Sequence, residues 1–464
     1  MNQRPPYYSN FNIDEIIEAH PIGEHFLPTF SKMSRDELYN IQEQRFLKCI
    51  KRAWQIPFYQ RHWHNVGLEE PDILKLSDIS KIPTFDKSDL MQSIENNPPF
   101  GDFSGTNLAQ KNHIPVIMHT TSGTTGTPQV LLFSPKTREI QNLLVARAYL
   151  FQGMTGTDVV HSIYGHGMVN AGHYMREAVT HYTNAIFCSA GTGVETRSVQ
   201  QIHIMKRFGA TIIVGFVDYL KRLAQVAKTE GIEIGKDIPI RMISGHFGRE
   251  DRAEISRLWG GAECFDWYGV GDTGIICAEG PDHSGMHIWE DAHYVEVTDV
   301  DSGKNLNDGE QGDVIDTVLF KDDLYPMIRF NTHDVSAFCK DKNKAGLVFK
   351  RLKGIFGRSD NMIKLRGINV FPHGLGGVLL ERPEFQGEFF CRVVRDQNGR
   401  DDMIVMAEVT ADISDSLKDS FRKILKSRIG VDMSVELYEP GKLSHLTEVD
   451  IRQKPKRMVD ERSI

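Results

Sequence analysis

The sequence predicts an α/β protein with a large N-terminal domain of mixed sheets and a distorted barrel element, plus a small α+β C-terminal domain. Short β-branched runs alternate with a helical segment between residues 210 and 269, which is typical of a mostly parallel sheet with crossover helices. From about Asp299, strands are separated by polar turns, which favours antiparallel pairing. A last change of pattern near residue 358 divides the chain into domains of 1–359 and 360–464.

Two helices are expected in the N-terminal part. Ser34 with Glu37 three residues later matches a capping box, and apolar residues then recur at helical spacing as far as Trp54. Pro57 breaks this pattern, and a second helix is expected to be capped near Asp86. The remaining elements are strands at 210–215, 240–245, 262–269, 313–320, 326–330, 334–338 and 403–410, and helices at 216–228 and 415–429.

The composition is that of a folded, soluble chain. Apolar residues make up 40% and charged residues 25% of 464 residues, with a formal net charge of -8. A mildly acidic chain is a poor general binder of nucleic acid or anionic membrane. The chain shows neither a membrane-spanning stretch nor a signal peptide, so we expect a cytoplasmic protein. Its six cysteines lie far apart, which predicts free buried thiols.

The segment His119–Phe133 carries the strongest local signal. Apolar runs flank a cluster of Thr, Ser and Gly, which predicts a loop between two strands. Glycines let the backbone approach a ligand closely, and successive N–H groups form an anion nest. This suits phosphate oxygens, although a plain hairpin loop is the alternative, and the string lacks the Walker pattern GxxxxGK[ST]. The candidate contacts are Thr121, Ser122, Gly123, Thr124, Thr125 and Gly126.

The string TSGTTGTP resembles the phosphate loop of the adenylate-forming (acyl-CoA synthetase-like) superfamily, and the preceding His119 is similar to the phenylacetate–CoA ligase branch. Further motifs follow in the order of that branch: IPFYQRHW, IPTFDKSDL, SIYGHGMVNAG, SGHFG, FDWYGVGDTG, YPMIRFNTHD, FGRSDNMIKLRGINVFP and QKPKRMVDER. The resemblance implies an N-terminal adenylation domain with a mobile C-terminal lid. It also implies a ligase that joins a small-molecule carboxylic acid to coenzyme A through an acyl-adenylate, with ATP, Mg²⁺ and coenzyme A.

The resemblance assigns roles to individual residues. Asp334 matches a ribose-binding carboxylate, Arg358 an arginine that reaches the ribose region, and Asp360 the hinge of the lid. Lys454 matches the catalytic lysine of adenylation, with Lys456 as the alternative. The remaining nucleotide contacts implied by the motifs are Gly245, His246, Phe247, Asp266, Trp267, Tyr268 and Gly269.

The chain departs from the family pattern in three places. Thr127 stands where the phosphate loop usually carries a lysine, which removes one positive charge. Gly271 and Asp272 replace the usual hydroxyl residue and glutamate, so Asp272 is the candidate Mg²⁺ ligand, one methylene shorter. The Cys-rich turn of some relatives is reduced to Cys339, which predicts no structural zinc.

The resemblance places the acid pocket at SIYGHGMVNAG, with Tyr164, His166, Asn170 and Gly269 as candidate contacts. This segment is only partly apolar, so we expect a small or aryl acid with a polar substituent such as a hydroxyl. The histidines at 161, 166, 173 and 181 have no spacing that predicts a metal cluster.

Several alternatives remain open from the sequence. The acyl group could pass to an amine or a carrier-protein thiol, although the basic strings 350–358 and 452–457 suit coenzyme A phosphates. A nucleotide-binding relative without catalysis, and an NTPase or kinase, are alternatives of other classes. The oligomeric state is open, a homodimer being the commonest arrangement.

Overall fold

The computed structural model describes residues 4–121, 129–247, 251–366, 368–395, 400–448 and 455–462. The chain forms two compact units. The large unit consists of Met1–His246 with Ile255–Gly354, and the small unit of Phe247–Glu254 with Ile355–Ile464. The division falls within helix α10 (Arg252–Leu258) and again after Gly354. The sequence-based boundary after residue 359 stays a prediction.

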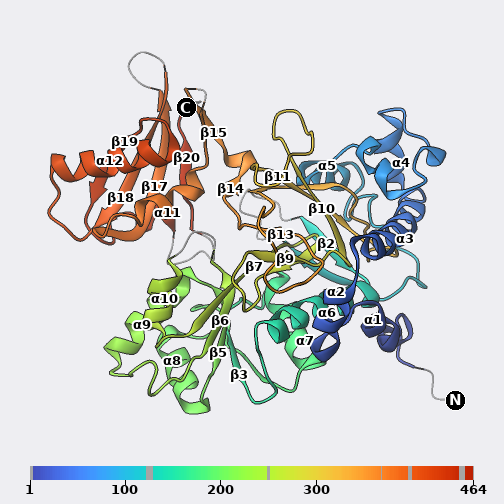
Figure 1. The fold of residues 1–464 in the computed structure, drawn as a ribbon, viewed down its shortest axis with the longest axis horizontal. Helices are drawn as coiled ribbons and strands as arrows, with labels where there is room; N and C mark the ends of the chain where they lie inside the picture. Colours follow the sequence, from blue (N-terminus) through green and yellow to red (C-terminus); the bar gives the residue numbers. More distant parts are fainter. Residues whose placement is uncertain are drawn as a thin grey trace. The chain divides into compact units, whose positions relative to one another are not determined.

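A mixed eight-stranded sheet runs through the large unit (Figure 1). In spatial order its strands are β13 (Arg351–Leu352), β9 (Met286–Ile288), β8 (Gly274–Ala278), β7 (Glu263–Val270), β6 (Met242–His246), β5 (Ile212–Phe216), β3 (Val159–Ser162) and β4 (Ile186–Ser189). The strands from β7 to β4 are parallel, and those from β13 to β7 are antiparallel. The predicted mixed α/β architecture, with strands near 210–215, 240–245 and 262–269, is therefore confirmed.

Two helix pairs accompany this sheet. Helices α8 (Ser198–Phe208) and α9 (Asp218–Thr229) lie together beside β5 and β6, whereas α6 (Pro135–Phe151) and α7 (Ala171–Tyr182) lie towards the N-terminal helices (Figure 1). Almost every residue of α6 is buried, as expected of a helix enclosed on all sides. Helix α6 therefore forms the centre of the large unit.

The N-terminal helices are α1 (Ile13–Ala19), α2 (Phe26–Lys32), α3 (Arg35–Ala53), α4 (Pro57–His64) and α5 (Lys87–Asn96). The predicted capping box of Ser34 and Glu37 opens α3, and Asp86 caps α5, as expected. Pro57 ends the pattern of α3 but also begins α4, because the first helical position needs no backbone donor.

An antiparallel element contains β10 (His293–Thr298), β11 (Gly312–Val318) and β12 (Phe330–Ser336). The strand predicted at 326–330 is wrong: β12 begins only at Phe330, and the left-handed backbone of Arg329 directly before it interrupts an extended run. Tyr325, Arg329 and His333 have φ of 56°, 54° and 57°. We call residues 325–333 the left-handed segment.

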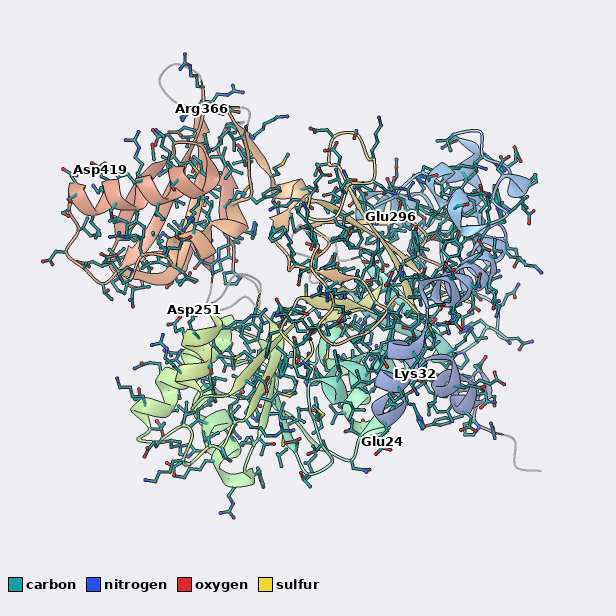
Figure 2. All side chains as sticks on the ribbon, viewed as in Figure 1. Glu24, Lys32, Asp251, Glu296, Arg366 and Asp419 are labelled. Atoms are coloured by element: carbon teal, nitrogen blue, oxygen red, sulfur yellow. The ribbon has the colours of Figure 1, made fainter. Side chains whose placement is uncertain are left out.

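Each of these three residues reaches a carboxylate from another part of the large unit. The Tyr325 hydroxyl donates to Asp272 Oδ1 at 2.5 Å. The Arg329 guanidinium donates to both oxygens of Glu296, which is labelled in Figure 2. His333 Nε2 lies 2.8 Å from Asp86 Oδ2. The strained backbone is therefore held by three separate polar contacts.

The small unit contains a sheet in the order β19-β18-β17-β20. Its strands are β14 (Gly357–Arg358), β15 (Ile363–Leu365), β16 (Ile368–Val370), β17 (Phe385–Arg395), β18 (Asp401–Val409), β19 (Ser434–Tyr438) and β20 (Met458–Asp460), and its helices are α11 (Gly376–Leu379), α12 (Asp415–Ile429) and α13 (Ser444–Thr447). Helix α12 has the predicted bounds, with Ser414 as its N-cap and Gly430 at φ 87° after its end. Phe421 and Leu425 of α12 pack into the core of this unit.

The six cysteines are all free thiols. Four are buried, but Cys188 and Cys339 are half-buried, so the expectation of buried thiols holds only for Cys49, Cys264, Cys277 and Cys391. Within the described part of the chain, no helix combines the length and apolar character needed to cross a membrane.

Candidate functional site

Aromatic side chains gather at the carboxyl end of the parallel strands. Tyr164 follows β3, Phe216 ends β5, His246 ends β6, and Trp267 lies in β7. The ring centres of His246 and Trp267 are 4.1 Å apart, those of His246 and Phe216 5.3 Å, and those of Tyr164 and Phe216 5.1 Å. The carboxyl edge of such a sheet is where α/β proteins bind ligands. The structure thus joins a predicted acid-pocket residue with two predicted nucleotide contacts.

Two glycines permit close backbone packing at this edge. A Cβ at Gly245 would lie 2.0 Å from the carbonyl oxygen of Gly215 in the neighbouring strand. A Cβ at Gly269 would lie 2.2 Å from the carbonyl oxygen of Gly274 across the β7–β8 pair. Both predicted contact residues must therefore be glycine for the strands to approach as they do.

Asp334 and Tyr268 bring two distant motifs together. The Tyr268 hydroxyl donates to Asp334 Oδ2 at 2.8 Å, and both residues are buried. Asp266, two residues before Tyr268, accepts a bond from the Trp267 amide at 2.9 Å, and its own amide donates to Glu279. The DWYG string and the strand β12 are therefore held against each other at the same edge.

His333, the residue before Asp334 in β12, lies between two carboxylates. His333 Nε2 lies 2.8 Å from Asp86 Oδ2, and Nδ1 lies 3.7 Å from Asp313 Oδ2. The carboxylates of Asp313 and Asp86 raise the pKa of His333 to about 9, so the imidazole is a cation near neutral pH. We call His333, Asp86 and Asp313 the histidine clamp. It fixes the backbone beside Asp334 to the cap of α5.

The candidate phosphate loop joins two paired strands, as predicted. Strand β1 (Ile117–Thr120) is antiparallel to β2 (Val130–Phe133). The Thr121 amide donates to the Gln129 carbonyl at 3.0 Å, and the Gln129 amide donates to the Thr121 hydroxyl at 3.2 Å. The predicted contacts Ser122, Gly123, Thr124, Thr125 and Gly126, and the departure at Thr127, lie outside the described residues.

Asp272 is the centre of a buried group that we call the Asp272 hub: Asp272, Gln129, Lys321 and Tyr325. Asp272 Oδ1 accepts bonds from Gln129 Nε2 at 2.6 Å and from the Tyr325 hydroxyl at 2.5 Å. Lys321 Nζ donates to the Asp272 carbonyl at 2.6 Å. Burial raises the pKa of the Asp272 carboxyl and lowers that of Lys321 to about 7.

This environment does not fit a magnesium ion on Asp272. Mg²⁺ needs oxygen ligands in near-octahedral geometry and usually keeps several waters. Here Asp272 is only 5% exposed, and one carboxylate oxygen already accepts two bonds. In the described ranges, no group of three or more His, Cys, Asp or Glu side chains is arranged to hold a metal ion.

The predicted acid segment packs against the approach to the loop. The Thr120 amide donates to the Met168 carbonyl at 2.9 Å. His166 is half-buried, its amide donates to Glu195, and Asn170 Oδ1 accepts a bond from Arg138 Nη1 at 2.5 Å. His166 Nε2, Asn170 Nδ2 and Arg138 Nη2 are buried and have no partner. Buried polar atoms without partners are rare and costly, so a polar ligand would suit this segment.

The other predicted contacts lie in the small unit. Arg252 lies over the Phe247 ring, 5.4 Å from its centre. Arg358 forms a two-pronged ion pair with Asp360, the predicted hinge, with bonds of 2.9 and 2.6 Å. Lys454 lies outside the described residues.

Lys456, the alternative to Lys454, pairs with Glu448. Its amide also donates to the Thr447 carbonyl at 2.8 Å, which fixes the backbone at this position. In this arrangement the Lys456 ammonium is already compensated by a carboxylate.

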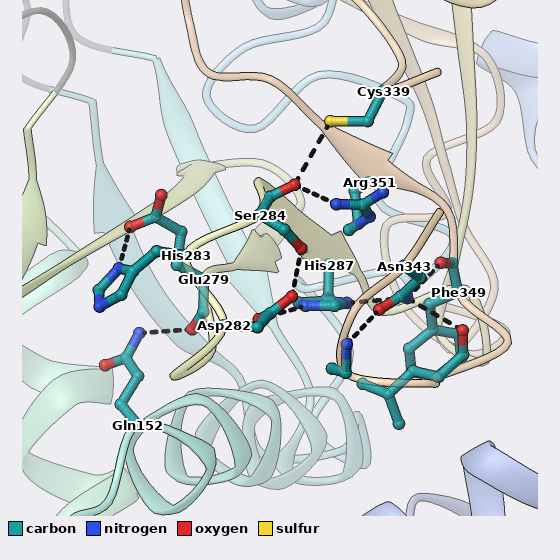
Figure 3. A network of polar contacts seen from close by, with 12 residues as sticks. Gln152, Glu279, Asp282, His283, Ser284, His287, Cys339, Asn343, Phe349 and Arg351 are labelled. Carbon is teal, nitrogen blue, oxygen red and sulfur yellow. Dashed lines mark hydrogen bonds and ion pairs between the residues drawn. The ribbon is translucent and has the colours of Figure 1, made fainter. Parts of the chain in front are cut away.

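Cys339 lies at one end of a polar network (Figure 3). The Arg351 guanidinium donates to the carbonyls of Ser284 and Asp341, and the Cys339 thiol donates to the same Ser284 carbonyl at 3.8 Å. Asn343 donates to the carbonyls of Leu347 and Phe349. Side-chain donors therefore join these turns through backbone carbonyls.

Sequence reasoning missed the residues that support the site. Gln129, Lys321, Tyr325 and Arg138 were not singled out, although each is nearly or fully buried. The one available signal was Lys321, a lysine that directly follows the apolar run VLF. A charged residue adjoining a buried strand is unusual enough to attract attention.

The chain is similar to known proteins both in its C-terminal part and over most of its length. Residues 367–462 match the family described as AMP-binding enzyme C-terminal domain. The chain is 27% identical over 457 residues to the phenylacetate-coenzyme A ligase of Aromatoleum evansii, covering 94% of this chain and 97% of that protein. It is 31% identical over 356 residues to the phenylacetate-coenzyme A ligase of Escherichia coli K12, covering 74% of this chain and 76% of that protein.

The fold is also similar to solved structures. A 2-hydroxyisobutyryl-CoA ligase in the postadenylation state, in complex with R3-HIB-AMP, aligns with a TM-score of 0.80 at 23% identity. The alignment covers 94% of this chain and 92% of that one. At this identity the match establishes the shared fold.

Proposed function

Since this chain belongs to the phenylacetate–coenzyme A ligase family, we propose that it joins a small or aryl carboxylic acid to coenzyme A with ATP. The acid carboxylate attacks the α-phosphorus, an O–P bond forms, and pyrophosphate leaves. The thiol of coenzyme A then attacks the acyl carbon, loses its proton, and displaces AMP. The balanced reaction converts acid, ATP and coenzyme A into acyl-CoA, AMP and pyrophosphate.

One observation carries the proposal: the contact between Tyr268 and Asp334 beside the aromatic edge of the sheet. It supports a nucleoside site in which Gly245, His246 and Trp267 meet the adenine and Asp334 binds the ribose hydroxyls. An aspartate whose carboxylate is hydrogen-bonded to a tyrosine keeps one orientation, which suits it to accept hydrogen bonds from the ribose hydroxyls. The remaining proposed nucleotide contacts are Asp266, Tyr268, Gly269 and, in the small unit, Phe247 and Arg358.

The phosphates are proposed to bind at the loop from Thr121 to Gly126. The hydrogen bonds between Thr121 and Gln129 join the two residues that flank this loop, which supports a binding site between them. ATP is proposed to bind with Mg²⁺ carried by its phosphate oxygens, because the surroundings of Asp272 do not suit the ion. Lys454 is proposed to stabilise the charge that develops at the α-phosphate.

The preferred acid is proposed to carry a polar substituent such as a hydroxyl. The partnerless atoms His166 Nε2 and Asn170 Nδ2 support this, since an apolar acid would leave them unsatisfied. Each buried polar group without a partner costs about 1–3 kcal/mol. Tyr164 is proposed to supply the apolar wall of the pocket.

The test measures pyrophosphate release with ATP and a panel of acids, followed by mass spectrometry of acyl-CoA. We expect release only when a suitable acid is present, and thioester only when coenzyme A is added. ATP hydrolysis without acid would indicate an NTPase, amide formation with added amines would indicate the other acceptor, and neither would indicate binding alone. Lys454→Ala should slow adenylation while thioester formation from a supplied acyl-adenylate survives.

The finer proposal about the acid has its own test. Matched acids with and without a hydroxyl are compared by kcat/KM in the wild type and in His166→Leu. We expect the wild type to prefer the hydroxylated acid and the variant to lose that preference. A wild type that prefers the unsubstituted acid would contradict the polar pocket.

A further inference from the structure

We propose that Lys321 and Tyr325 are positioning residues that hold the base of the phosphate loop through Asp272, and that Asp272 serves as this anchor instead of binding magnesium. The Asp272 hub lies wholly in the large unit and is described completely. The inference rests on the proposed function only in taking the loop to bind phosphates.

The Asp272 hub binds Gln129, the residue at which the loop joins strand β2. Gln129 directly precedes β2, and its backbone is bonded twice to Thr121 on the other side of the loop. Its side-chain Nε2 lies 2.6 Å from Asp272 Oδ1 and 3.1 Å from the Tyr325 hydroxyl. Because the Tyr325 hydroxyl also donates to the same Oδ1, the three groups form a closed triangle. A closed triangle fixes the Gln129 side chain, and with it the spacing across the loop.

Lys321 makes further contacts with two members of this triangle, Asp272 and Tyr325. Its side chain is 0% exposed, and Nζ donates to the Asp272 carbonyl. Nζ also lies 4.2 Å from the centre of the Tyr325 ring and 5.3 Å from that of Phe133 in β2. The lysine therefore contacts the anchor, its tyrosine donor and the strand that follows the loop.

The contacts of Asp272 favour a role as an anchor over a role as a metal ligand. Lys321 Nζ donates to the Asp272 carbonyl, so the backbone oxygen nearest the anchor already has a nitrogen donor and is not free to bind Mg²⁺, which prefers oxygen ligands. The carboxylate oxygen Oδ1 already has two donors, so a metal would have to displace them. Anchoring uses the contacts that exist, whereas metal binding would need to break them.

The first experiment measures amide hydrogen exchange without any nucleotide. In Tyr325→Phe and in Lys321→Met, we expect the peptide covering 117–133 to exchange about tenfold faster, as expected for the loss of roughly one hydrogen bond. Tyr182→Phe is the matched control, because it also removes a tyrosine–carboxylate bond, to Glu139, outside the hub. The control should leave the 117–133 peptide unchanged. If Lys321→Met fails to fold, Tyr325→Phe alone decides.

The second experiment titrates a non-hydrolysable ATP analogue by calorimetry at several MgCl₂ concentrations. We expect Asp272→Asn and Tyr325→Phe each to weaken binding about five- to tenfold, with the double variant no weaker than about the worse single one. The MgCl₂ concentration for half-maximal effect should stay within about twofold of the wild type, since the metal is not held by Asp272.

Two results would overturn the inference. One is unchanged exchange of the 117–133 peptide in the hub variants. The other is a shift of about tenfold or more in the MgCl₂ requirement of Asp272→Asn, the size expected for a lost metal ligand. Because the exchange experiment contains no substrate, it stands even if no acid supports pyrophosphate release, and that failure would count against the proposed function alone.

Discussion

The large unit contains ion pairs that are fully buried, whereas the ion pairs described in the small unit are all at least partly exposed. In the large unit, Arg147 and Asp291 form an ion pair whose side chains are 0% and 1% exposed. In the small unit, the pair of Arg428 and Glu381 is 57% and 37% exposed. Arg366, labelled in Figure 2, likewise pairs near the surface with Asp402. A buried pair is a permanent part of the structure, because separating it leaves an uncompensated charge. Exposed pairs exchange partners at little cost, which suits a unit that the family resemblance implies is a mobile lid.

The largest effect on stability is expected for the variant Arg147→Met, which removes one partner of the buried pair. Arg147 donates to both oxygens of Asp291 at 2.7 and 2.9 Å, and Nε donates to the Pro21 carbonyl. Loss of one partner of a buried pair should lower the free energy of unfolding by about 3–5 kcal/mol. Urea unfolding followed by circular dichroism measures this. The double variant Arg147→Met with Asp291→Asn should recover part of the loss, and a loss below about 1 kcal/mol would contradict the role of burial.

The next effect is expected at the candidate nucleoside site. Asp334→Ala should weaken binding of a non-hydrolysable ATP analogue by about 1.5–3 kcal/mol, the range for a lost hydrogen bond to a charged group. The fold should survive, which circular dichroism of the variant checks. Calorimetry measures the affinity, and Asp415→Ala, which removes an exposed carboxylate of the small unit, is the control. An unchanged dissociation constant would remove Asp334 from the site.

The histidine clamp predicts a pH dependence. The pKa of His333 is raised from 6.5 to about 9 by Asp313 and Asp86, so the clamp contributes its full stability below about pH 6.5. This contribution should diminish as the pH rises and be lost above about 9, when the imidazole is neutral. The difference in unfolding temperature between wild type and His333→Asn should therefore shrink between pH 6.5 and 9.5. A constant difference would show that the imidazole charge does not matter.

The smallest effect is expected at an exposed pair of the small unit. Arg428→Ala removes the contact with Glu381 and should leave the free energy of unfolding nearly unchanged, because both side chains are exposed to solvent. Urea unfolding with and without added salt checks this value. A larger loss would show that exposed pairs also carry stability here, and would weaken the contrast between the units.

Local patterns in the sequence predicted local structure well. The capping box of Ser34 and the bounds of α12 follow from residues within a few positions of one another. Tyr164, His246 and Trp267, which the motifs assign to the acid and nucleotide sites, are neighbours in the structure.

Long-range contacts could not be predicted in the same way. Gln129 meets residues 143 and 196 positions further along the chain. No periodicity reports such a contact, so Asp272 was interpreted from its motif alone as a metal ligand. The strand predicted at 326–330 failed for a related reason. Its β-compatible residues are interrupted by left-handed backbone that tertiary contacts maintain.

The left-handed segment also has a consequence for how this sequence can change in evolution. A residue such as Tyr325, Arg329 or His333 at positive φ costs about 1–2 kcal/mol, which glycine would avoid. Glycine would also abolish the contact with Asp272, Glu296 or Asp86 that each side chain makes. No single substitution relieves the backbone and keeps the contact. We therefore expect homologues to alter each of these residues together with its acidic partner, so that the three pairs diverge as units.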